Sequence, residues 1–289
     1  MSGTEFDLIT TDDPEEEELT EASKIVEECN ASDGTHYGPV YDADLYIFAY
    51  DEQGRMTAVL AAYAMGGTFR GSAVTEAAAF VRPAFRRQGI LRSMLEALKE
   101  EPEGEGAIRF AVYETALTGA VLRAIGAEKE HDELMMQLIP DRDRLNQLEA
   151  IAEESSLAVM IEPEEWDAPV PLKDADGPSE DGIGALADEV VRNAPQTNYY
   201  CHSAYSELHI RTGSANAYIY GVQTASSMLR KHCAKRLLAR VILHFHKQGY
   251  ERFLLEVSDT NLPAVSLYRK LGFAEADRLS YYYEMDKCL

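Results

Sequence analysis

The residues best suited to chemistry form a basic turn that contains a glycine, at positions 81–92, with the sequence Val-Arg-Pro-Ala-Phe-Arg-Arg-Gln-Gly-Ile-Leu-Arg. The chain as a whole has a formal net charge of −23, so a local cluster of arginines stands out. We expect a strand to end near Val81, a turn at Gly89 and a helix over residues 91–98. The free N–H groups of the first helical turn, the helix dipole and the arginines favour an anion, so we predict a phosphate site.

The turn resembles the pyrophosphate-binding turn of the GNAT-superfamily N-acetyltransferases. The resemblance rests on Arg86-x-x-Gly89-x-Leu91 after a Val-x-Pro strand end, and Leu91 departs from the small residue usual at the last position. It implies that backbone amides of this turn hold the pyrophosphate of acetyl-CoA. The cofactor-binding residues expected here are Val81, Arg86, Arg87, Gln88, Gly89, Ile90, Leu91 and Arg92. An ordinary basic helix start explains the same residues without a ligand.

A second segment, residues 251–273, resembles the other diagnostic part of the same family. It holds a buried apolar run, then Asn261-Leu-Pro-Ala as a helix start, Tyr268 within the helix and Gly272-Phe after it. The resemblance implies that Asn261 contacts the pantetheine arm and that Tyr268 protonates the departing CoA thiolate. The alternative for Tyr268 is a partly buried core tyrosine at helical spacing.

The two halves of the chain align with each other as copies of one unit. A gapless match of the turn at residues 229–234 places Leu229 at the Arg/Gln position and His232 at the glycine position. In the first half, Thr115 stands at the Asn position and Leu122 at the Tyr position. Each copy is therefore altered in a different place: the first keeps the phosphate turn and the second keeps the candidate acid.

Length and element order predict an α/β (α+β) protein of two domains, at residues 1–140 and 141–289, and the resemblance implies that these are two tandem GNAT-like domains. A chain of 289 residues suits two domains of about 100–200 residues. Strands come first and then alternate with helices, which favours a mixed, mostly antiparallel twisted sheet flanked by helices. The strands expected are 45–50, 56–63, 73–81, 108–112, 134–138, 205–211, 218–224, 253–257 and 278–285. The helices expected are 19–28, 91–98, 116–125, 182–192 and 235–248, with a helical connection at 140–154 and a loop at 162–181.

Cysteine and histidine spacing predicts no disulfide framework and no metal site. The cysteines, at positions 29, 201, 233 and 288, show no Cys-x-x-Cys spacing, and His244-x-His246 would place its rings on different sides of a helix. With no leader pattern at the N-terminus and no apolar run near 20 residues, we expect a cytoplasmic protein.

The acidity bears on partners. A sequence pI near 4.6 disfavours nucleic acid and anionic membranes. It would concentrate a cationic amine, although acidic runs that serve only solubility are the favoured explanation. A homodimer is left open.

We therefore expect acetyl-CoA-dependent transfer of an acetyl group to a primary amine of a small molecule or peptide. The first unit is favoured as the acetyl-CoA site because Gly89 allows close approach of backbone to phosphate, and the second unit is the rival. The alternative is a non-catalytic acyl-CoA-binding or interaction protein in which both sites have decayed. Glu76 is close to a general-base position but one residue out of register, and His202 and His209 are expected to be structural.

Overall fold

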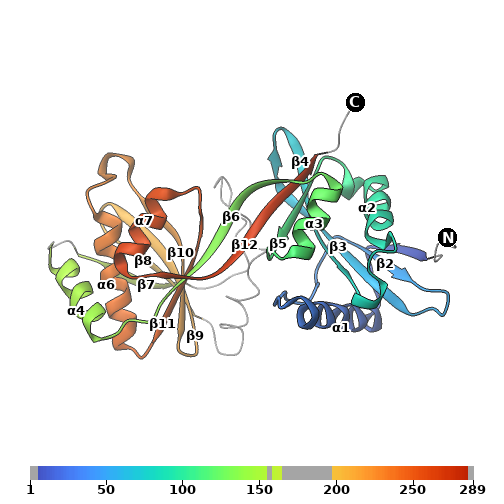
Figure 1. Cartoon of the computed structure of the whole chain (residues 1–289). Helices are drawn as coiled ribbons and strands as arrows, with labels where there is room; N and C mark the ends of the chain where they lie inside the picture. The colour runs from blue at the N-terminus through green and yellow to red at the C-terminus, as the bar shows by residue number, and fades with distance from the viewer. Residues whose placement is uncertain (1–5, 155–157, 165–196, 286–289) are drawn as a thin grey trace. The chain divides into compact units, whose positions relative to one another are not determined.

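A computed structural model describes residues 6–154, 158–164 and 197–285 of the chain (Figure 1). Contacts divide the chain into two compact units. Unit 1 comprises Met1–His131 and Leu279–Leu289, and unit 2 comprises Asp132–Arg278. A boundary between residues 140 and 141, as predicted from the sequence, leaves the last strand of each half with that half. The division by contacts instead places residues 132–140 in unit 2 and residues 279–289 in unit 1.

Unit 1 is built on a mixed sheet in which only one neighbouring pair of strands is parallel. The strands, in their order across the sheet, are β1 (Asp7–Thr11), β2 (Leu45–Tyr50), β3 (Met56–Phe69), β4 (Ser72–Val81), β5 (Ala107–Val112) and β12 (Ala274–Met285). The parallel pair is β4 with β5, and every other pairing is antiparallel.

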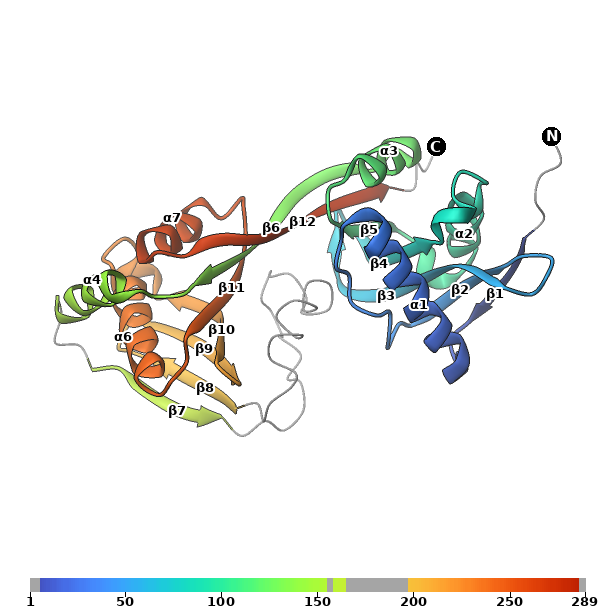
Figure 2. The ribbon, with the colours of Figure 1, turned by 60° about the horizontal axis from the view of Figure 1, so that its bottom comes forward.

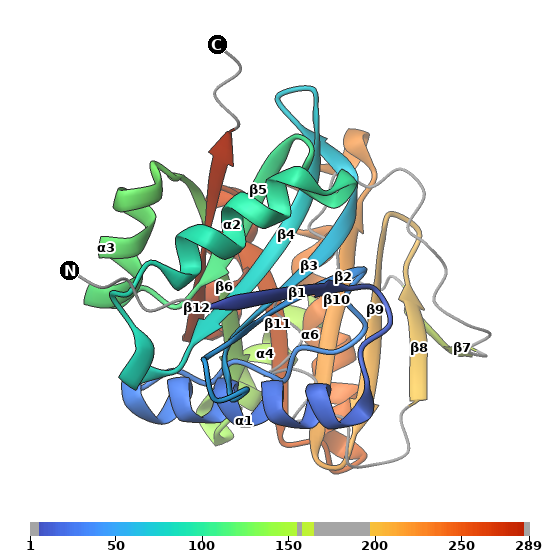
Figure 3. The ribbon, with the colours of Figure 1, turned by 90° about the vertical axis from the view of Figure 1, so that its right-hand side faces the viewer.

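Helices cover both faces of this sheet (Figures 2 and 3). Helix α1 (Glu16–Asp33) packs its apolar stripe, including Ile25 and Val26, on one face. Helices α2 (Ile90–Glu100) and α3 (Ala116–Ile125) pack on the other. Short 3₁₀ turns, η1 (Pro83–Phe85) and η2 (Pro102–Gly104), precede and follow α2. The turn before α2 is thus anchored between a central strand and a core helix.

Unit 2 repeats the plan, again with one parallel pair. Its strands, in order across the sheet, are β6 (Glu128–Leu138), β11 (Arg252–Ser258), β10 (Asn216–Thr224), β9 (Ser206–Gly213), β8 (Thr197–His202) and β7 (Met160–Glu164). The parallel pair is β10 with β11.

Three helices of unit 2 pack together on one face of its sheet (Figure 2): α4 (Arg142–Glu153), α6 (Cys233–Lys247) and α7 (Leu262–Leu271). Helix α6 follows the 3₁₀ turn η3 (Ser226–Met228) and buries Leu237, Leu238, Val241, Ile242 and Phe245, at the three-to-four-residue spacing of a core-facing stripe. The side chains that alternate with the core positions of β9 and β10 therefore lie on the other face.

The last strand of each sheet comes from the other half of the chain. In unit 1, residues Ser280 to Met285 of β12 pair antiparallel with β5. In unit 2, residues Glu133 to Leu138 of β6 pair antiparallel with β11. Both strands carry buried side chains, so each half of the chain completes the core of the unit that the other half begins.

The expected fold class is confirmed, and the main strands and helices fall where the sequence predicts them. Three short strands, β1, β7 and β8, are absent from the sequence-based prediction. The loop predicted at 162–181 begins with the end of β7, and its remainder lies outside the described residues, as does the helix predicted at 182–192.

Candidate functional site

The parallel pair of unit 2 separates part of the way along its length. Residues Asn216 to Ile219 of β10 pair with Arg252 to Leu255 of β11, and β10 then continues to Thr224 without a further position paired with β11. Against its other neighbour, β9, strand β10 has a bulge between Tyr220 and Gln223, where Gly221 has φ +61°. A bulge re-aims the backbone of the strand that carries it. It therefore turns peptide groups of β10 at the point where β11 diverges.

The bulge is a site feature that sequence reasoning missed. An isolated glycine within a strand pattern, as in Tyr-Gly221-Val, is a signal for a bulge or for close approach of another group.

The turn after β10 leads directly into the N-terminus of α6. Arg230 and His232 both have left-handed backbone, with φ +61° and +62°, and His232 is the residue before the first residue of the helix. Arg230, Lys231 and His232 are exposed. Exposed cationic side chains beside the free N–H groups of a first helical turn suit a phosphate group.

The turn of unit 1 has the same backbone. Arg87 has φ +64°, and Gly89, with φ +91°, directly precedes α2. The residues before each 3₁₀ turn also agree, since Arg82 has φ −46° and ψ 135° and Ala225 has φ −51° and ψ 132°. The backbone angles of the two turns therefore agree with their gapless alignment, which sets His232 against Gly89.

The arginines of unit 1 are engaged by acidic residues of α1. The guanidinium of Arg86 donates to both carboxylate oxygens of Asp33, at 2.7 and 2.8 Å, and to the carbonyl of Val81 at 3.0 Å. Burial works to lower the pKa of Arg86, but its hydrogen bonds to Asp33 and Cys29 and the charges of these two groups together raise that pKa. Arg82 donates to Glu28 at 2.6 Å and also to Glu21. Two of the four arginines thus stabilise the contact with α1.

A tyrosine bridges the ends of β4 and β5 in unit 1. These strands pair only from Val74 to Glu76. Beyond that point, the ring of Tyr37 lies 5.2 Å from that of Phe80 on β4 and 4.8 Å from that of Tyr113, which follows β5. The Tyr113 N–H donates to the Tyr37 hydroxyl at 2.8 Å. The separation of the strands is therefore spanned by a side chain of unit 1 itself.

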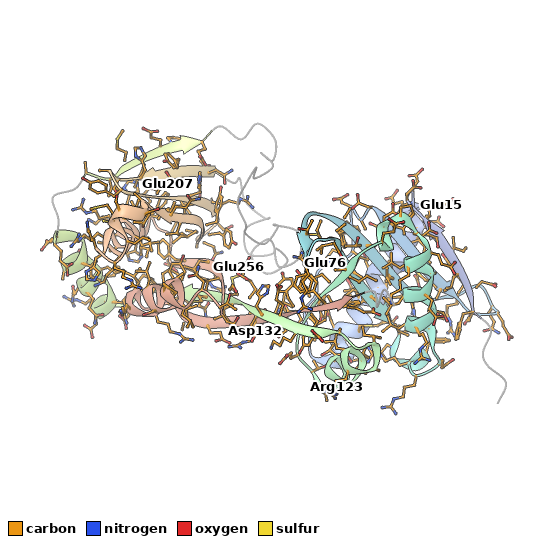
Figure 4. All side chains as sticks on the ribbon, turned by 90° about the horizontal axis from the view of Figure 1, so that it is seen from above. Glu15, Glu76, Arg123, Asp132, Glu207 and Glu256 are labelled. Atoms are coloured by element: carbon orange, nitrogen blue, oxygen red, sulfur yellow. The ribbon has the colours of Figure 1, made fainter. Side chains whose placement is uncertain are left out.

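Glu76, which the sequence placed near a general-base position, lies on β4 (Figure 4) and is buried at 5% exposure. Its Oε2 accepts from Nε of Arg109 at 2.7 Å and lies 2.6 Å from Nη2 of that arginine. The Arg109 guanidinium also lies 5.0 Å over the ring of Tyr281. This carboxylate is held in a buried ion pair.

The helix after β11 carries the candidate acid of unit 2. The Oδ1 of Asn261 accepts from the Ala264 N–H at 3.3 Å and so caps α7, and Gly272 ends the helix with φ +99°. Tyr268 is 6% exposed, and burial raises its pKa to about 12. The hydroxyl therefore keeps its proton at neutral pH and is able to donate it.

The equivalent helix of unit 1 has no such acid. Thr115 caps α3 by accepting from the Thr118 N–H at 3.1 Å, and Leu122 is buried at 4% exposure. The predicted site residues are thus divided. Val81 to Arg92 lie in unit 1, where Ile90 is buried in the core and Gln88 and Arg92 are exposed, whereas Asn261 and Tyr268 lie in unit 2.

Within the described part of the chain, no group of three His, Cys, Asp or Glu side chains could hold a metal ion. Cys29, Cys201 and Cys233 are buried free thiols, and Cys288 lies outside the described residues. No described helix is long and apolar enough to cross a membrane.

Comparisons with known proteins bear on the fold and on the segment that unit 2 contributes. The family model for the acetyltransferase (GNAT) family matches residues 198–273, which lie in unit 2. An uncharacterized N-acetyltransferase, YsnE of Bacillus subtilis (strain 168), is 36% identical over 83 residues, which span 28% of this chain and 52% of that protein. The chain thus matches about half the length of this curated relative.

Solved structures share the fold over nearly the whole chain. A GCN5-related N-acetyltransferase from Sphaerobacter thermophilus has a TM-score of 0.59 at 13% identity, covering 96% of this chain and 95% of that one. A tandem GNAT protein from the clavulanic acid biosynthesis pathway has a TM-score of 0.60 at 12% identity, covering 97% and 98%. The chain therefore shares the fold of these proteins, one of which is a tandem GNAT protein, and its residues 198–273 match the acetyltransferase (GNAT) family model.

Proposed function

We propose that unit 2 binds acetyl-CoA and transfers its acetyl group to a primary amine of a small molecule or peptide. The observation that carries the proposal is the combination, within one unit, of diverging parallel strands, a bulge at Gly221 and a cationic turn before α6. The family match at residues 198–273 supports the same unit.

The residues of unit 2 suit the parts of acetyl-CoA. First-turn N–H groups of α6, with Arg230 and Lys231, are suited to the pyrophosphate. His232 does not distort the turn, since its backbone has the left-handed conformation seen at Gly89. Peptide N–H groups at the bulge are suited to the thioester oxygen, on which negative charge develops during attack. The Tyr268 hydroxyl supplies the proton that the departing thiolate takes.

The sequence favours unit 1 as the acetyl-CoA site, and this remains a prediction. Two observations weigh against it. The Arg86 guanidinium already donates to both carboxylate oxygens of Asp33. Tyr37 spans the ends of the two strands, where the pantetheine arm would pass. Gly89 still leaves that turn sterically open, because a Cβ there would meet nothing within 4 Å.

The acceptor we propose is a cationic amine. The formal net charge of −23 favours the approach of cations and disfavours nucleic acid and anionic membranes.

The second candidate function is acyl-CoA binding without catalysis. It is favoured by the altered positions in both units, His232 in the turn of unit 2 and Leu122 in place of the tyrosine in unit 1.

A thiol-release assay with acetyl-CoA and a panel of diamines, amino sugars and lysine peptides tests the proposal, with acetyl-CoA binding measured by calorimetry in parallel. Transfer predicts amine-dependent release of CoA thiol and an acetylated product detected by mass. Binding of acetyl-CoA with no thiol release from any amine would favour the non-catalytic function. Absence of both would contradict the proposal.

A further inference from the structure

A cluster of titratable side chains lies on the face of the unit 2 sheet away from α6. Leu208 and Ile210 of β9 belong to the core against the helices, so the alternate residues, Glu207 and His209, lie on the opposite face (Figure 4 labels Glu207). None of these residues has a part in the function proposed so far.

His209 forms a pair with a carboxylate of the edge strand β7. Its Nδ1 lies 3.1 Å from Oε2 of Glu164, and both side chains are about one-third exposed, at 32% and 34%. A carboxylate that accepts from Nδ1 holds the imidazole in one orientation and leaves Nε2 as the nitrogen with a lone pair. His209 is therefore set up to accept a proton at Nε2.

Tyrosines hold the imidazole ring from two sides. The ring of Tyr200 lies 5.3 Å from that of His209, and the ring of Tyr220 lies 5.2 Å away and nearly parallel. The Tyr200 hydroxyl donates to Glu207 at 2.6 Å, and this hydrogen bond raises the pKa of Tyr200 to about 12. Tyr200 is thus neutral near neutral pH and leaves the base role to the histidine.

The imidazole also lies against the bulge of β10. A Cβ built on Gly221 would stand 3.0 Å from Cδ2 of His209 and 3.8 Å from its Nε2. The atom Nε2, which is not the nitrogen paired with Glu164, is therefore the ring nitrogen near the bulge backbone. Glycine at position 221 is what permits this approach, both through its left-handed φ and through its missing side chain.

We propose that His209 is the general base of unit 2 and that Glu164 is its positioning residue. This rests on the proposed function, in which the bulge receives the thioester. The neutral amine attacks the thioester carbon, and its nitrogen forms the new C–N bond. His209 Nε2 takes one proton from that nitrogen, the C–S bond breaks, and the thiolate takes a proton from Tyr268. The products are the N-acetyl amide and CoA thiol, and solvent returns the proton from His209 to Tyr268.

Other charged and titratable groups surround this base. They come from every described strand packed against it and are Glu162 and Glu164 on β7, Tyr200 and His202 on β8, Glu207 and Arg211 on β9, and Tyr218 and Tyr220 on β10. Arg211 lies 5.7 Å from the Tyr220 ring. The carboxylates are suited to a cationic acceptor approaching His209 from this face.

The test compares His209→Gln with His202→Gln, a matched control whose ring stacks on Tyr200 at 4.9 Å but is not the ring that the Gly221 position faces. We expect kcat/KM for the amine to fall about 100-fold in His209→Gln, the usual scale for general-base loss, and to stay within about twofold in the control. The dissociation constant of acetyl-CoA should be unchanged in both variants. In His209→Ala, added imidazole should restore part of the rate.

The outcomes separate this inference from the function on which it rests. If the wild type is active and His209→Gln retains the wild-type rate, the role of His209 is overturned but the proposed function is not. Equal loss in both variants, or loss in His209→Ala without rescue by imidazole, would also overturn it. Wild type without amine-dependent thiol release would overturn the proposed function and this inference with it. Far-ultraviolet circular dichroism and acetyl-CoA affinity establish that each variant is folded.

Discussion

Gly89 and His232 occupy the same position in the two turns, and both have left-handed backbone. Each directly precedes the first residue of the helix that follows, α2 in unit 1 and α6 in unit 2. Glycine adopts this conformation without cost, whereas an L side chain there is strained. Unit 2 therefore retains the shape of the turn despite the substitution.

Replacing the strained residue should stabilise unit 2. We expect His232→Gly to raise the free energy of unfolding by about 0.5–1 kcal/mol, since relief of left-handed strain is partly offset by the greater freedom of glycine in the unfolded chain. Acetyl-CoA affinity should be retained or improved. Urea unfolding of the variant measures the first quantity, and a destabilised variant would mean that the His232 ring makes contacts that outweigh the strain.

Tyr268→Phe should remove the proton donor without disturbing the fold. Turnover is expected to fall about 100-fold while the dissociation constant of acetyl-CoA stays constant, because only the transfer to the thiolate loses its acid. Tyr37→Phe is the matched control, since burial also raises the pKa of Tyr37 to about 12 in unit 1. Unchanged turnover in Tyr268→Phe would remove this residue from the mechanism.

The raised pKa of Tyr268 has its own pH signature. Because the folded pKa is about 12 and the ordinary value is 10, the neutral hydroxyl is retained through pH 10. Its contribution to stability is fully present below pH 10 and is lost as pH rises through about 12. The tyrosinate absorbance of wild type minus Tyr268→Phe should therefore appear near pH 12, and appearance near pH 10 would contradict the burial account.

Much of this architecture could be predicted from sequence, because the apolar runs of the central strands and the glycine ends of the helices are local signals. The short strands could not. β7 contains Pro163, and β8 contains the polar residues Thr197, Asn198 and His202, so neither shows a clean alternation.

The exchange of last strands was also beyond sequence reasoning. β6 and β12 each read as the final strand of their own half, and nothing local states which sheet a strand joins. The contacts of Arg86 with Asp33 and of Tyr37 with Tyr113 link residues far apart in the chain. From the sequence, the arginines of the turn at Val81 to Arg92 are therefore expected to be free for a ligand, whereas in the structure two of them are paired with acidic residues of α1.

The exchanged strand β12 should stabilise unit 1 rather than the unit that precedes it in sequence. Tyr281 is 1% exposed and stacks on His131 with ring centroids 4.8 Å apart, so Tyr281→Ala should cost about 3–5 kcal/mol. Hydrogen exchange should accelerate in β4 and β5. It should stay slow in β10 and α6. Tyr205→Ala, at an exposed tyrosine of unit 2, is the control. Hydrogen exchange that accelerates only in unit 2 of Tyr281→Ala would contradict the assignment of β12 to unit 1.

Glu76 should prove structural. Glu76→Gln leaves the buried Arg109 guanidinium without its counter-charge, which typically costs about 3–5 kcal/mol. The turnover of the folded variant should match that of wild type, because the proposed site lies in unit 2. Thermal unfolding and kcat, measured on the same preparation, distinguish the two roles. A stable variant with lost turnover would make Glu76 a catalytic base and return the site to unit 1.

The most direct test of the central claim, that unit 2 holds acetyl-CoA, compares Arg230→Glu with Arg87→Glu by titration calorimetry. These arginines are exposed, occupy equivalent turn positions and have nearly equal φ values, +61° and +64°, so the substitutions are matched in strain and charge. The account predicts that Arg230→Glu weakens acetyl-CoA binding about tenfold or more, the usual scale for a charged phosphate contact, and that Arg87→Glu leaves it unchanged. Weakened binding in Arg87→Glu with wild-type affinity in Arg230→Glu would contradict it.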